Sequence, residues 1–201
     1  DNAASIQVPD TIQGIIAARM DRLEDNLKRT MQVASVIGRD FAYRILHTIT
    51  GMREDLKSSL LNLQGLEFIY EKSLFPELEY SFKHALIQEV AYNSHLVVRK
   101  KEFHEKIGKA IVGIYAERLG EFYETLAYHY SKSDNFEKAY HYLKLSGEKS
   151  VENYSNWESF RFFNEALKAL NRLNDSEENM RKKISIILSI IKPSSSLGLP
   201  E

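Results

Sequence analysis

His84 is a residue of this chain whose type and position suit contact with an anion. It follows two short aromatic and β-branched runs, residues 68–70 and 78–82, which predict a β-hairpin. Apolar residues at helical spacing over 86–91 then predict a helix whose first turn holds His84. A basic side chain and free backbone N–H groups at a helix N-terminus can meet an anion such as a phosphate. His84, with Lys83 beside it, is therefore a candidate phosphate contact.

The residue types give little indication of catalysis, of a nucleotide-binding loop or of a metal site. The chain has no cysteine, which excludes disulfides and thiolate catalysis. It also has no glycine-rich phosphate loop ending in Lys-Ser or Lys-Thr. His104 beside Glu105, and His129 with His141, come nearest to a metal-ligand set, but adjacent helical residues do not converge on one ion. We expect no catalytic residue, metal site or resident cofactor in this chain.

Aromatic residues supply the candidates for protein binding. The chain has 11 Tyr and 10 Phe, and many of them lie in its second half. We expect most of them to pack between helices, because aromatic rings supply large buried areas in thin helical layers. Three are predicted to lie exposed and to anchor a protein partner: Tyr128, Tyr142 and Trp157.

Charge and hydropathy restrict the partners further. Lys and Arg total 27 against 28 Asp and Glu among 201 residues, so no global field attracts a polyanion. The helix predicted over 53–66 carries acids beside few basic residues, and we do not expect it to bind DNA, even with the basic run at 99–101. The apolar run at 184–191 is too short to cross a membrane, and no signal peptide is evident. We expect a cytoplasmic protein with no membrane partner.

The elements that would position His84 are mainly helical. Helices are predicted over 11–23, 26–37, 41–49 and 53–66, the third of them capped by Asp40. A single short β-hairpin and the helix at His84 follow. Helices followed by a hairpin and one more helix have the order of a winged-helix domain. The predicted class is therefore all-α (mainly), with one small wing.

The second half is predicted to be an antiparallel helical array. Its helices are expected over 99–119, 121–131, 136–154, 157–173 and 177–191, with short polar links that make neighbours antiparallel. One stretch is similar to a tetratricopeptide repeat in its spacing of large, small and aromatic residues. The matching residues are Tyr123, Leu126, Ala127, Tyr130, Ala139 and Leu143. A second copy fits poorly, so packing stripes explain the remaining periodicity.

Three ordered segments, residues 8–23, 34–41 and 82–92, carry a resemblance to a known family. They resemble the winged-helix and helical-repeat part of signalling ATPases of the STAND class, especially bacterial adenylate or guanylate cyclases with an AAA-like ATPase region. In related switch ATPases a Met-His-Asp triplet opens the last winged-helix helix, and its histidine touches bound ADP. The matching residues here are Lys83, His84 and Ala85, so the carboxylate of the triplet is absent.

The resemblance implies a non-catalytic regulatory module. Residues 1–8 would link it to a preceding ATPase region, 9–97 would form the winged helix, 98–192 the tetratricopeptide-like repeats and 193–201 a further linker. The parent would bind ATP or ADP, with His84 sensing the nucleotide held by an N-terminal nucleotide-binding domain of the same chain. The repeats would bind a protein partner. An alternative is a fragment of a STAND-type transcription regulator whose DNA-binding domain lies elsewhere in the parent.

Overall fold

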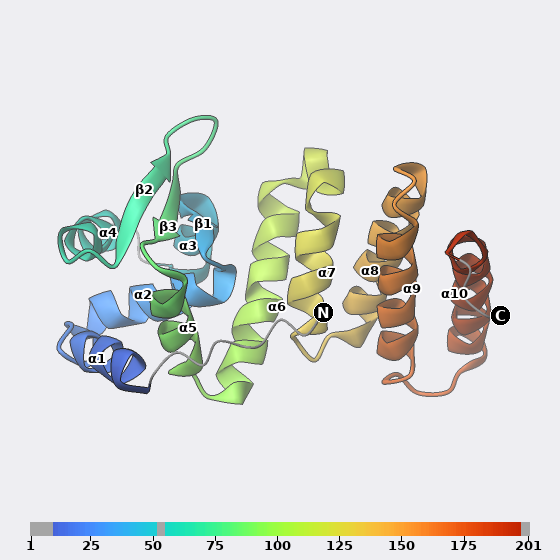
Figure 1. The fold of residues 1–201 in the computed structure, drawn as a ribbon, viewed down its shortest axis with the longest axis horizontal. Coiled ribbons are helices and arrows are strands. Elements are labelled where there is room, and N and C mark those ends of the chain that lie inside the picture. The colour runs from blue at the N-terminus through green and yellow to red at the C-terminus, as the bar shows by residue number, and fades with distance from the viewer. Residues whose placement is uncertain (1–9, 52–54, 198–201) are drawn as a thin grey trace. The chain divides into compact units, whose positions relative to one another are not determined.

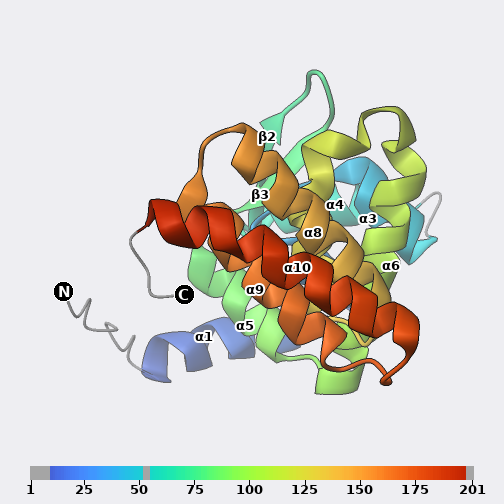
Figure 2. The same ribbon diagram turned by 90° about the vertical axis from the view of Figure 1, so that its right-hand side faces the viewer.

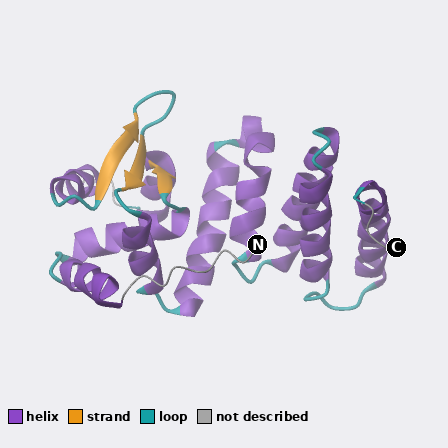
Figure 3. Ribbon diagram, in the orientation of Figure 1, coloured by secondary structure: helices purple, strands orange, loops and turns teal. Residues whose placement is uncertain are grey.

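The computed structural model describes residues 10–51 and 55–197, and these are mainly helical with a small three-stranded antiparallel sheet (Figures 1 and 3). The predicted mainly helical class is confirmed. The chain divides into two compact units between Phe103 and His104. This division falls inside one helix, α6 (Val97–Ile114), a little beyond the boundary predicted after residue 97. The residues predicted to form a linker at 1–8 lie outside the described part.

The first unit contains a helical core with the sheet beside it. Its helices pack around fully buried side chains such as Met31, Leu46, Leu60 and Phe82. The predicted helices at 11–23 and 26–37 are confirmed with small shifts at their ends. The helices of the first unit are α1 (Asp10–Asp21), α2 (Asp25–Ile37), α3 (Tyr43–Thr50), α4 (Asp55–Gly65), α5 (Ala85–Asn93) and the first part of α6.

The sheet corrects the prediction of a single hairpin. Its strands are β1 (Asp40–Ala42), β2 (Ile69–Ser73) and β3 (Glu79–Phe82), and β3 lies in the middle with both neighbours antiparallel. Asp40 begins β1 and does not cap a helix, because α3 starts only at Tyr43. Phe41 pairs with Tyr80, and their buried rings stack with centroids 5.9 Å apart. A two-stranded hairpin is marginal alone, and β1 gives it a third strand and a buried aromatic pair.

The second unit begins inside α6. The end of this helix differs from the predicted one. The predicted helix to residue 119 ends at Ile114, and a 3₁₀ segment, η1 (Ala116–Phe122), follows. Tyr115 is buried, and its ring stacks on Phe122 with centroids 4.2 Å apart. Arg118 within η1 has a non-helical backbone, with φ −129° and ψ 34°, so the α-helix does not continue to residue 119.

Four further helices complete the second unit: α7 (Tyr123–Ser131), α8 (Phe136–Glu152), α9 (Asn156–Leu170) and α10 (Glu177–Ser196). Each packs against the next one along the chain, and Figure 2 shows α10 lying across α9. Helix α10 continues through Pro193 to Ser196, so the linker predicted from residue 193 is helical over its first four residues. Among the residues that the structure describes, no helix is long and apolar enough to cross a membrane.

Candidate functional site

His84 occupies the N-cap of α5, directly after β3 ends. Its backbone is extended, with φ −134° and ψ 141°, so it lies one residue before the first turn in which we predicted it. Its carbonyl oxygen accepts a hydrogen bond from the Ile87 N–H at 3.0 Å, which closes the first turn. The imidazole makes no capping hydrogen bond and is exposed. The ring is thus held at a helix N-terminus and faces solvent.

Lys83 anchors this corner to the loop that precedes β2. Its backbone N–H donates to the Phe68 carbonyl at 3.0 Å, and its Nζ donates to Oε1 of Glu67 at 2.8 Å. Glu67 adopts φ 61°, an uncommon value for a residue with a side chain. The Lys83 hydrogen bond lowers the pKa of the Glu67 carboxyl, and charges on Arg19 and His84 lower it further.

Arg19 joins the corner from α1, and sequence reasoning did not find it. Its guanidinium donates to the Leu66 carbonyl at 2.9 Å and lies over the Phe68 ring, 4.7 Å from the centroid. Arg19, Lys83 and His84 therefore surround one exposed carboxylate, Glu67. An anion brought to this corner would meet two permanent cations and an imidazole, and it would compete with Glu67 for Lys83.

The three aromatic residues predicted to anchor a partner do not share one environment. Tyr128 and Trp157 are exposed, Trp157 by 62%. Tyr142 is only 3% exposed, so its prediction as a surface anchor is wrong. Its ring stacks on Tyr130 with centroids 5.5 Å apart. A signal was present in the sequence, because Tyr142 belongs to the helically spaced buried face of α8: Ala139, Tyr142, Leu143 and Ser146.

His104 and His129 form a buried pair that the sequence analysis did not foresee. Their Nδ1 atoms lie 2.9 Å apart, joining α6 to α7, and both side chains are almost completely buried. Burial, together with the smaller effect of the nearby His104, lowers the pKa of His129 to about 3. One ring must donate and the other accept, so the contact is a buried hydrogen bond between α6 and α7. No group of three or more metal-ligand side chains occurs within residues 10–51 and 55–197.

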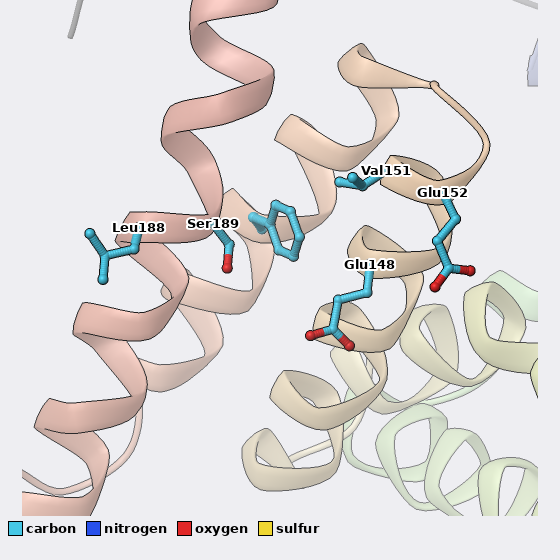
Figure 4. Close-up of a pocket in the computed structure, with 6 residues that line it drawn as sticks. Glu148, Val151, Glu152, Leu188 and Ser189 are labelled. Carbon is cyan, nitrogen blue, oxygen red and sulfur yellow. The ribbon is translucent and has the colours of Figure 1, made fainter.

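A groove of about 400 Å³ opens between α8, α9 and α10 (Figure 4). Apolar side chains of Val151, Phe163 and Leu188 line it, together with Ser189. Two acids of α8, Glu148 and Glu152, also line it. Glu148 has an ion pair with Lys144 at 3.2 Å, and Glu152 is exposed. The groove therefore combines an apolar lining with negative charge.

Comparison with known proteins gave no relatives: no family model, curated protein or solved structure matches this chain. The geometry of its own residues must therefore carry any functional conclusion. That geometry offers an exposed histidine among cations in the first unit, and an apolar groove with acidic residues in the second.

Proposed function

We propose that this chain is a non-catalytic regulatory and protein-interaction module of a multidomain signalling ATPase, with a class III nucleotide cyclase as the output domain of the parent. The first unit acts as a winged helix that contacts a nucleotide-binding domain. The second acts as a tetratricopeptide-like array that binds a protein partner. A ligand that prefers one state of the parent shifts the balance between states by its difference in affinity, and this requires no chemistry within the chain.

The observation that carries the proposal is the placement of His84. A histidine at a helix N-cap, with its ring directed to solvent and with Lys83 and Arg19 nearby, suits contact with a phosphate of a nucleotide held by another domain. Ala85 follows where the related triplet has an acid, so the ring is not oriented by a neighbouring carboxylate. Glu67 supplies negative charge to this corner from another element.

The order of elements also supports the winged-helix assignment. Helix α2, strand β1, helices α3 and α4, and the β2–β3 hairpin follow one another, with β1 on the free edge of β3. This succession is the one expected of the proposed winged helix. The interlocking helices α7 and α8 likewise bury the repeat-like residues Leu126, Tyr130 and Ala139.

Calorimetric titration of the full-length protein with ADP tests this function. We expect His84→Ala to weaken ADP binding by about tenfold or more, since a hydrogen bond to a charged group contributes about 1.5–3 kcal/mol. His141→Ala, which removes an exposed histidine of α8, is the matched control and should leave the affinity unchanged. Equal ADP affinity in the wild type and His84→Ala would contradict the sensing role.

A further inference from the structure

Helix α10 has an apolar face that no described residue covers. The face consists of five side chains, each between 48% and 62% exposed: Met180, Ile184, Ile187, Leu188 and Ile191. Ile186, on the opposite side of the helix, is fully buried, and α10 packs against α9. Figure 2 shows α10 in front of α9, with the length of the helix open toward the viewer. This exposed set is called the α10 face below.

The spacing of the α10 face is that of a helix-pairing seam. Met180, Ile184, Ile187 and Ile191 follow one another at intervals of four, three and four residues, the a/d spacing of paired helices. Five large side chains, each about half exposed, leave on the order of 500 Å² of apolar surface, as much as the largest patch of a typical monomer, and such patches are often functional. A stable interface buries roughly 800 Å² per partner, so polar residues around the α10 face must also be buried in the dimer.

We propose that the α10 face binds the same face of a second copy of this chain, with the two α10 helices antiparallel. A two-fold interface requires a surface that complements itself. The α10 face meets this requirement about a point between Ile187 and Leu188. Antiparallel pairing around that point sets Ile184 opposite Ile191, and Ile187 opposite Leu188. Each of these four aliphatic side chains therefore packs against an aliphatic side chain of the other copy.

Charge favours the same arrangement. The N-terminal half of α10 carries Arg181, Lys182 and Lys183 together with Glu177 and Glu178, and Lys182 and Lys183 pair with Glu178 and Asp175. Glu148 and Glu152 lie beside Leu188 and Ser189, in the groove next to the other half. An antiparallel pair brings Arg181 of each copy toward the half of α10 that borders the acidic groove of the other. Arg181 is held only by an exposed ion pair with Glu177, and such pairs contribute little, so Arg181 is available to rearrange.

This dimer does not depend on the proposed nucleotide sensing, because it involves only residues of the second unit. The first test is sedimentation velocity of the 201-residue chain. We expect a species of twice 23.2 kDa that dissociates on dilution. Ile187→Glu should weaken association at least tenfold, since it places a charge in the apolar seam. Leu61→Glu, at an exposed leucine of α4, makes the same change elsewhere and should leave the dimer intact.

Cross-linking then tests the direction of pairing. The chain has no cysteine, so each introduced thiol is unique. In the proposed arrangement Leu188→Cys lies close to its own symmetry mate, whereas Met180→Cys lies about 20 Å from its mate along the helix axis, at a rise of about 1.5 Å per residue. A short bismaleimide should therefore join Leu188→Cys chains and leave Met180→Cys chains unlinked.

Three results would overturn the proposal. A monomer at every concentration tested would mean that another segment or partner covers the α10 face. A dimer unaffected by Ile187→Glu would place the interface elsewhere. Equal cross-linking at both cysteine positions would indicate parallel helices. Circular dichroism of each variant should match the wild type, because all substituted positions are exposed.

Discussion

His104 and His129 can share only one hydrogen between their facing Nδ1 atoms, which are 2.9 Å apart. The two residues are 25 positions apart in the chain, and neither is distinctive in its local sequence. Their pairing depends on how α6 meets α7, which helical periodicity does not specify. Burial disfavours the charged imidazolium of His129, and the nearby His104 adds to this effect, so the pKa of His129 is low.

Acid should therefore destabilise the second unit. The pKa of His129 is about 3 in the folded chain and about 6.5 when unfolded, so the stability tied to its neutral form is present above pH 6.5 and is lost as pH falls. At pH 5.5 this loss amounts to about 1.4 kcal/mol, the free energy of one pKa unit. Urea titrations followed through Trp157, the single tryptophan, at pH 7.5 and 5.5 measure it.

Two substitutions separate His129 from other titrating groups. His129→Gln retains a hydrogen-bonding amide but does not titrate, so the difference in unfolding free energy between the two pH values should shrink by about 1.4 kcal/mol. His84→Gln changes an exposed histidine and should retain the full difference. A pH dependence that His129→Gln leaves unchanged would show that the buried pair does not titrate on unfolding.

Helix packing in the second unit depends on two glycines at close helix crossings. A Cβ at Gly147 of α8 would lie 2.5 Å from Cε1 of Phe163 on α9. A Cβ at Gly108 of α6 would lie 2.7 Å from Cζ of Tyr130 on α7. Real side chains do not approach so closely, so in both places glycine lets an aromatic ring lie directly against the neighbouring helix backbone.

Gly147→Ala should consequently destabilise the second unit by about 1–3 kcal/mol, the usual cost of overpacking. Gly113→Ala is the matched control in α6, because a Cβ there meets nothing within 4 Å. Alanine is the better helix former by up to about 1 kcal/mol, so the control should be neutral or stabilising. Urea unfolding followed by Trp157 fluorescence gives both values. Equal effects at the two glycines would mean that the Phe163 contact is not rigid.

The helices and strands show which features of the fold could be predicted from the sequence. Helical periodicity placed most helices to within a few residues, since each buries an apolar stripe on its neighbour. It failed at Asp40–Ala42, because Phe41, Ile45 and Ile49 also fit a helix, and only pairing with β3 makes the first of them a strand residue. The exposed corner around His84 was predicted in part. Arg19 and Glu67 are remote in sequence and reach it only through the tertiary fold.

At the scale of the whole molecule, charges of both signs are interspersed. The formal net charge is −1, and two lysines of the first unit are paired with acids: Lys72 of β2 with Asp40, and Lys83, directly after β3, with Glu67. The loop between β2 and β3 presents Leu74 and Phe75, both exposed, where a DNA-binding loop would carry basic side chains. Nonspecific DNA binding needs several unpaired cations to displace counterions from phosphates.

We therefore expect no DNA binding at physiological ionic strength. Fluorescence anisotropy with a labelled 20-base-pair duplex at 150 mM salt should give a dissociation constant of about 10⁻⁴ M or weaker, the weak end of nonspecific binding. The residues best placed to bind DNA are Lys100 and its neighbours Arg99 and Lys101. The Nζ atom of Lys100 lies 4.3 Å from the centroid of the Tyr92 ring. Micromolar binding that weakens steeply with salt and is lost in Lys100→Glu would contradict this expectation, because a local patch would then outweigh the balanced charge of the chain.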